Sequence, residues 1–226
     1  MVYMKKLKIS IVLNSIIVVL SVLSTIMMIT GFRFMHGTET ILETTRLGVF
    51  KFFTVDSNLF MGLVSLAFLM NEIAILKGKK ESITLRNYIL KLMGTTAVAL
   101  TCIVVLTYLG PISKYGLFSL LMNSNLFFHL VIPVLSVVTF IFFEKTDKLK
   151  FKHVILGIIP TILYAIFYIV NVLIHVEGGA VSTAYDWYWF VQDGLWTSLI
   201  VTPIILLVTY LISFLLWKFN RVKNEI

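Results

Sequence analysis

The stretch LFSLLMNSNLFFHLVIPVLSVVTFIFFE, residues 117–144, is almost wholly apolar and longer than the roughly 20 residues that cross a bilayer core. Its middle carries His129, and Pro133 follows one turn later. An ionisable side chain at mid-bilayer costs about 3 kcal/mol on insertion scales, so it is expected to have a partner or a task. The stretch therefore predicts a transmembrane helix that turns a polar face towards other helices.

The rest of the chain repeats this apolar character. Its 226 residues are 59% hydrophobic, and the mean hydropathy is +0.97. The basic start MVYMKKLK is typical of a signal peptide, but the apolar run after it is too long for one, so we keep that run as a helix. One cysteine, Cys102, excludes an internal disulfide. We predict an all-α, polytopic bundle in a single domain over 1–226, with six transmembrane helices at about 9–32, 50–76, 88–110, 117–143, 153–175 and 196–217.

The basic residues are unevenly distributed between the two predicted sides of the membrane. Fifteen Lys and Arg residues, Lys91 among them, fall at the termini and around the 77–87 and 144–152 loops. The opposite side holds four, namely Arg33, Arg46, Lys51 and Lys114. This asymmetry predicts that both termini are cytoplasmic. The basic residues behind the net charge of +8 are then expected to contact lipid headgroups, and no nucleic acid is expected as a partner.

Polar residues form stripes on three predicted helices at 100° per residue. We expect Glu72 to lie near the cytoplasmic headgroups beside a lysine, and we expect no metal site. Asp56 projects away from its stripe; it is a functional acid, a salt-bridge partner of Lys51 or Arg46, or a solvated residue. The stripes contain Lys51, Thr54, Asn58, Ser65 and Glu72 on the second helix, Asn125, His129 and Ser136 on the fourth, and Tyr164, Tyr168, Asn171 and His175 on the fifth.

The loop 176–194 contains no Lys or Arg and is dense in aromatic residues. Trp187, Tyr188 and Trp189 are typical of an interfacial aromatic belt. An alternative interpretation is a lid over an outward-facing cavity, anchored by these rings.

Thr54 and His129 together suggest a nucleophile and its base. A threonine hydroxyl needs a base within hydrogen-bond reach, and a neutral imidazole suits that role. The side-chain amides of Asn58 or Asn125 could stabilise an oxyanion. One difficulty concerns depth: if the similar segments DSNLF (56–60) and NSNLF (123–127) are level, Thr54 lies about 12 Å above His129 along the membrane normal.

Several short motifs occur in the order found in one membrane-protein family. Phe50 to Thr54 reads FKFFT, close to a W-K-F-L-T-like helix start, and Arg86-Asn87-Tyr88 matches an R-D-W-like start. The next helix carries Asn125, His129, Pro133 and Glu144 in sequence. In these features the chain resembles the androgen-induced family of six-helix membrane threonine hydrolases, which includes the androgen-dependent regulator of tissue factor pathway inhibitor.

The resemblance implies a hydrolase of fatty acid esters of hydroxy fatty acids, with Thr54 as nucleophile and His129 as base. It implies a membrane lipid or fatty-acyl substrate and no cofactor. The SNLF elements resemble a prokaryotic branch, which implies a prokaryotic plasma membrane. We expect the candidate cavity to include Lys51, Asp56, Tyr164, Tyr168, Asn171, His175, Trp187 and Trp189.

Two other functions fit the same pattern. One is a small-molecule binding or transport bundle, such as the substrate-capture subunit of a vitamin transporter, with Trp187 and Trp189 on the ligand. The other is a catalytically silent lipid-binding protein. The sequence does not indicate an oligomeric state.

Overall fold

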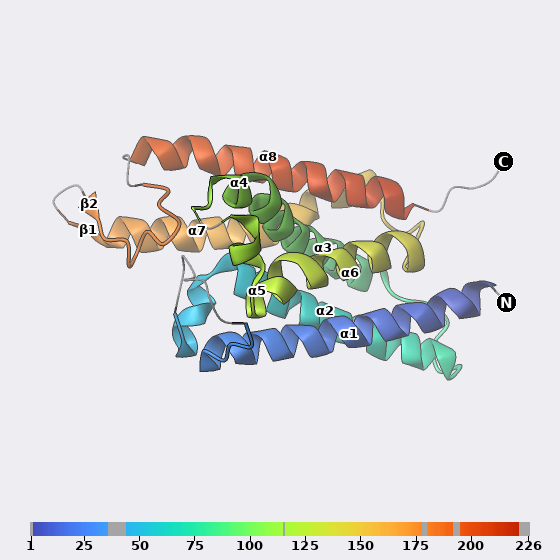
Figure 1. Ribbon diagram of the computed structural model, residues 1–226. Coiled ribbons are helices and arrows are strands. Elements are labelled where there is room, and N and C mark those ends of the chain that lie inside the picture. The colour runs from blue at the N-terminus through green and yellow to red at the C-terminus, as the bar shows by residue number, and fades with distance from the viewer. Residues whose placement is uncertain (1, 36–43, 115, 178–179, 192–194, 222–226) are drawn as a thin grey trace.

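The computed structural model describes residues 2–35, 44–114, 116–177, 180–191 and 195–221, and these form an all-α membrane protein. Within them, six helices are long and apolar enough to cross a membrane, which confirms the predicted helix number. The start of the first helix and the end of the last lie together at one end of the bundle (Figure 1), here called the terminal end. The spans are Tyr3–Thr30, Phe53–Leu76, Leu85–Ile112, Ser124–Phe143, Phe151–Ile174 and Trp196–Asn220.

Some spans are single α-helices and others are built from shorter pieces. The first, second and last spans are α1 (Val2–Thr30), α2 (Phe53–Leu76) and α8 (Leu195–Asn220). The third span joins α3 (Leu85–Val104), the π-helical turn η2 (Val105–Leu109) and α4 (Gly110–Ile112). The fourth span joins α5 (Ser124–Leu126), the π-helical turn η4 (Phe127–Val131), α6 (Ile132–Val138) and the π-helical turn η5 (Thr139–Phe143). The fifth span joins the 3-10 helix η6 (Phe151–Ile158) to α7 (Ile159–Ile174).

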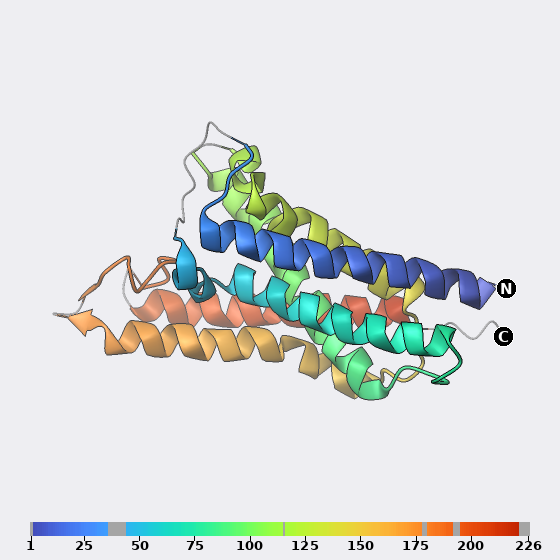
Figure 2. The ribbon, with the colours of Figure 1, turned by 90° about the horizontal axis from the view of Figure 1, so that it is seen from below.

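Short elements occupy the end of the bundle away from the termini, here called the far end. The 3-10 helix η1 (Arg46–Lys51) leads into α2, and the 3-10 helix η3 (Leu117–Leu121) precedes the fourth span. The strands β1 (Val176–Glu177) and β2 (Ala180–Val181) pair antiparallel after α7. Figures 1 and 2 show α1 and α2 side by side, α7 beside α8, and α3 crossing between these pairs.

Two helix starts differ from their predictions by more than the others do. The fourth membrane-spanning helix begins at Ser124 rather than at 117, because Asn123 has a φ of 55° and breaks the helix before it. The first helix begins at Val2 rather than at 9, because lysine is a good helix former and extends the helix beyond its apolar part.

Two prolines explain the π-helical turns η2 and η4. Proline lacks an N–H, and its ring collides with the carbonyl four residues earlier. Pro133 acts in this way on His129, which lies in η4, and Pro111 acts on Thr107, which lies in η2. The turn that carries His129 is therefore π-helical because of a local sequence feature.

Glycines allow close helix approaches at two places. A Cβ at Gly62 of α2 would lie 2.7 Å from the Cβ of Ser21 on α1. A Cβ at Gly157 of η6 would lie 2.1 Å from the Ser213 hydroxyl of α8. Small residues of this kind let membrane helices pack with their backbones close together.

Candidate functional site

A buried ion pair lies in the half of the bundle nearer the terminal end. The ammonium of Lys91 on α3 is 3.0 Å from Oε1 of Glu144, at the end of the fourth span, and the two side chains are 0% and 1% exposed. The ammonium also donates to Ser65 Oγ on α2 (3.2 Å) and to Asn14 Oδ1 on α1. Its three N–H groups thus meet acceptors from three different elements, which fixes the position of the charge.

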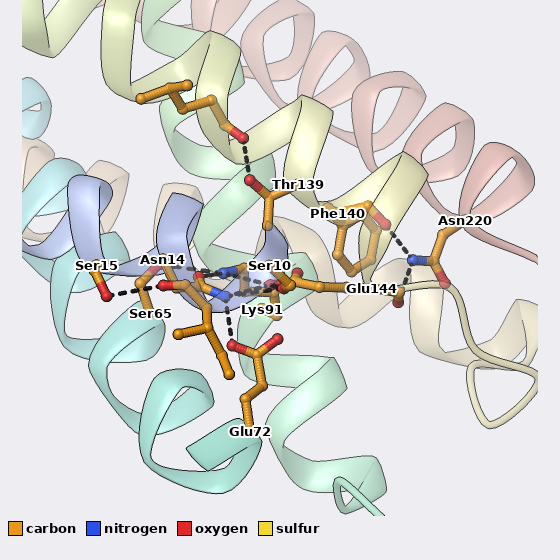
Figure 3. A network of polar contacts seen from close by, with 12 residues as sticks. Ser10, Asn14, Ser15, Ser65, Glu72, Lys91, Thr139, Phe140, Glu144 and Asn220 are labelled. Atoms are coloured by element: carbon orange, nitrogen blue, oxygen red, sulfur yellow. Dashed lines mark hydrogen bonds and ion pairs between the residues drawn. The ribbon is translucent and has the colours of Figure 1, made fainter. Parts of the chain in front are cut away.

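Asn14 joins this pair to a second carboxylate (Figure 3). Its Nδ2 donates to Glu144 Oε1 at 2.8 Å and to Glu72 Oε2 at 3.1 Å, and Ser10 Oγ donates to Glu144 Oε1 at 3.3 Å. We call the group the Lys91 network; its members are Ser10, Asn14, Ser65, Glu72, Lys91 and Glu144.

The end of α8 holds the backbone around Glu144. Asn220 Nδ2 donates to the carbonyls of Phe140 (2.6 Å) and Glu144 (2.9 Å), as Figure 3 shows. These carbonyls stand at the end of a helix, where they have no partner within the helix itself. Asn220 thus places the Glu144 carboxylate against α1 and α3.

The Lys91 network corrects two expectations from sequence. Glu72 does interact with a lysine, Lys91, as expected, but it is 1% exposed and bonded to Asn14, so it is not a headgroup residue. Lys91 is fully buried rather than a basic residue that flanks the membrane. Its side chain extends over the ring of Phe68, with the ammonium 5.0 Å from the ring centroid. A lysine so placed marks a bundle interior rather than a membrane surface.

Asn58 connects the turn of Thr54 to the turn of His129. Its Nδ2 donates to the backbone carbonyls of Thr54 (2.8 Å) and Phe128 (3.2 Å). The two carbonyls therefore lie on either side of one buried amide group. If the two SNLF segments were at the same depth, Phe128 would be level with Met61 of α2. Its carbonyl is instead bonded to Asn58, three residues earlier, so η4 lies nearer the far end than that alignment predicts. A displacement of three residues is about 4.5 Å at 1.5 Å per residue, so it removes roughly a third of the expected 12 Å difference in depth.

The side chains of Thr54 and His129 come from the second and fourth spans and are not bonded to each other. Among the described residues no hydrogen bond joins them, and the buried Nδ1 of His129 has no partner. Both N–H groups of Asn58 are already used, so Asn58 positions the backbone and does not offer a free oxyanion donor. Asn125 lies one turn before His129 and lines a small pocket against the end of α1, together with Arg33.

The aromatic loop after α7 packs onto the far end of the bundle. Tyr164 of α7 donates to the Lys51 carbonyl (2.5 Å) and accepts a bond from Trp187 Nε1 (3.0 Å). Tyr188 accepts a bond from the first N–H of α2, at Phe53 (3.0 Å). Burial raises the pKa of Tyr188 to about 12, so its hydroxyl stays protonated. The loop thus caps α2 in place of a polar N-cap residue.

Asp186 organises this loop from within. It is fully buried and accepts hydrogen bonds from the hydroxyl of Tyr168 and from the backbone N–H groups of Phe190 (2.9 Å) and Val191 (3.1 Å). Asp186 is not among the site residues predicted from the sequence. The sequence feature that could have revealed it is a lone acidic residue within an aromatic segment. A carboxylate buried in such a segment needs several hydrogen-bond donors to stabilise it.

The remaining cavity residues predicted from sequence have mainly structural contacts. Asn171 Nδ2 donates to the Tyr185 carbonyl (2.8 Å), and the ring of His175 stacks on that of Tyr185 with centroids 3.6 Å apart. Trp187 is 4% exposed, whereas Trp189 is 51% exposed and has a φ of 58°. Lys51 Nζ lies 5.3 Å from the centroid of the Trp187 ring. The contacts of these residues hold the aromatic loop against the end of the bundle.

Replacement of Asp186 by alanine is expected to loosen the aromatic loop, because three donors lose a charged acceptor worth roughly 1.5–3 kcal/mol for each bond. Chymotrypsin should then cleave at Trp187 to Phe190 several-fold faster, as measured by mass spectrometry of the fragments. The exposed Glu177, replaced by alanine, is the matched control. Unchanged cleavage in the Asp186 variant would show that packing alone holds the loop.

A groove of about 430 Å³ runs between α2 and α7, with Met93 of α3 beside it. Asp56 and Ser57 face it from α2, and the rest of its lining is apolar or aromatic. Asp56 and Tyr164 therefore line one groove, which lies between the second, third and fifth spans. Neither Thr54 nor His129 lines it.

Comparisons with protein-family models, with curated proteins and with solved structures found no match for this chain. The assignment of a function therefore rests on the residues described above.

Proposed function

We propose that the chain is an intramembrane lipid-ester hydrolase that uses Thr54 as nucleophile and His129 as general base. The observation that carries this proposal is the Asn58 bridge, which holds the turns of these two residues on either side of one amide. The unpartnered, buried Nδ1 of His129 supports it, since this nitrogen is free to take a proton. The order of motifs resembling the androgen-induced family agrees with the same pair.

The proposed reaction has two steps. The Thr54 hydroxyl oxygen attacks the ester carbonyl carbon while His129 takes its proton; the alcohol leaves with that proton, and the acyl group stays on Thr54. Water then attacks the acyl-threonine, again giving a proton to His129, and the fatty acid leaves as Thr54 regains its hydrogen. Asn125 is the proposed oxyanion donor. Side-chain shifts on substrate binding would bring hydroxyl and imidazole into contact, as is common for catalytic hydrogen bonds.

The test uses purified protein in detergent micelles with a fatty acid ester of a hydroxy fatty acid, isotope-labelled in its acyl chain. We expect labelled fatty acid to be released in proportion to protein, and a labelled acyl group on the peptide containing Thr54 after a rapid acid quench. Release no faster than with heat-inactivated protein, across several acyl lengths, would refute the proposal.

We further propose a prokaryotic plasma membrane, because the SNLF elements resemble a prokaryotic branch of the family. The distribution of Lys and Arg supports the proposal that the terminal end lies in the cytoplasm. In a Cys102→Ser background, a cysteine at exposed Thr183 should react with an impermeant maleimide in right-side-out vesicles. A cysteine at exposed Lys79 should react only after the vesicles are opened. The reverse pattern would place the termini outside.

A further inference from the structure

The groove between α2 and α7 has a continuous aromatic wall. The rings of Phe53 and Tyr164 are 5.1 Å apart, and those of Tyr164 and Phe167 are 6.0 Å apart. The Tyr164 hydroxyl is held by Lys51 and Trp187, so the ring has a fixed orientation. Phe50 and Phe60 add two more rings to the lining. A ligand in the groove would therefore contact several aromatic rings.

One carboxylate faces this wall. Asp56 forms no hydrogen bond or ion pair through its side chain with any residue that the structure describes. The nearest basic residue along the chain, Lys51, instead places its ammonium over the rings of Phe52 and Trp187, at 5.2 and 5.3 Å from the centroids. Asp56 also lies in the first turn of α2, where the helix dipole favours a negative charge. The groove thus pairs aromatic faces with an uncompensated carboxylate.

We propose that this groove is a binding site for a hydrophobic organic cation, with its positive centre at Asp56 and its apolar body along the rings. Ammonium ions are bound in proteins by this combination of aromatic faces and a carboxylate, and binding strengthens where water is excluded. The volume of about 430 Å³ falls within the range of small-molecule sites. Apart from Asp56, Ser57 and the rings, the lining consists of the apolar residues Met93, Pro160 and Leu163. The site does not use Thr54 or His129, so it is independent of the hydrolase proposal.

The test compares two ions of the same shape and opposite charge, tetraphenylphosphonium and tetraphenylborate, by equilibrium dialysis against the purified protein. Saturable binding of the phosphonium alone is expected for the wild-type chain. Asp56→Asn should weaken it roughly tenfold or more, since the carboxylate supplies the charge, and Phe167→Leu should weaken it several-fold by removing one ring. Asp147→Asn, at an exposed loop carboxylate, is the matched control.

The same measurements contain the outcomes that overturn the proposal. Equal binding of both ions, or no saturable phosphonium binding, would show that the groove is only an apolar contact for lipid. Wild-type affinity in Asp56→Asn would place the cation elsewhere. Because Phe167 is half exposed, its leucine variant is expected to fold normally even if Asp56→Asn does not, and wild-type affinity in that variant would also refute the site.

Discussion

Replacement of Lys91 by methionine is expected to destabilise the protein by about 3–5 kcal/mol, because it leaves a buried carboxylate without its cation. Glu144 is 3.0 Å from the ammonium, and its second oxygen already has no hydrogen-bond partner. Methionine keeps most of the lysine side-chain length and its packing against Phe68. The loss should therefore reflect the missing charge and the missing bonds to Asn14 and Ser65 rather than a cavity.

The measurement is reversible unfolding in mixed micelles as the fraction of sodium dodecyl sulfate is raised, followed by circular dichroism. The double variant Lys91→Met with Glu144→Gln should recover at least about half of the lost stability, because no unpaired charge remains. Lys79→Met, at an exposed position, should change stability by no more than about 0.5 kcal/mol. A Lys91 variant as stable as this control would mean that the ion pair has no net effect.

The six membrane helices could be predicted because hydropathy measures the property that membrane insertion selects. The start of the fourth span could not, because residues 117–122 are as apolar as the helix itself and the break depends on the φ of Asn123. Hydropathy identifies membrane segments and does not locate the backbone break between them.

The Lys91 network could not be predicted from the sequence either, because it depends on how the helices pack. Lys91 lies two turns inside α3, close to other basic residues in the chain, and the positive-inside pattern assigns all of them to the surface. Glu72 and Ser65 do share one face of α2, as predicted, but the partners of that face come from α1 and α3. A pairing between helices depends on their packing, which periodicity within one helix does not reveal. The depth of His129 relative to Thr54 was misjudged for the same reason.

Replacement of Thr54 by alanine is expected to lower kcat/KM for lipid-ester hydrolysis by roughly a thousandfold or more, because the acyl-accepting oxygen is lost. Thr54→Ser keeps a hydroxyl and should retain activity within about tenfold of wild type. Thr107→Ala is the matched control, since its exposed hydroxyl bonds only to its own helix, at the Ile103 carbonyl (2.7 Å). Each variant is assayed by release of labelled fatty acid, with the stability of the fold checked by circular dichroism.

The role of His129 is tested by combining variants. If the imidazole acts only on the Thr54 hydroxyl, His129→Gln should lower kcat by about 10²–10⁴-fold, and the double variant should be no slower than Thr54→Ala alone. Additive losses would mean that the two side chains act in separate steps. Wild-type turnover by Thr54→Ala would remove the threonine as nucleophile, and the Asn58 bridge would then be an interhelical contact that stabilises the bundle.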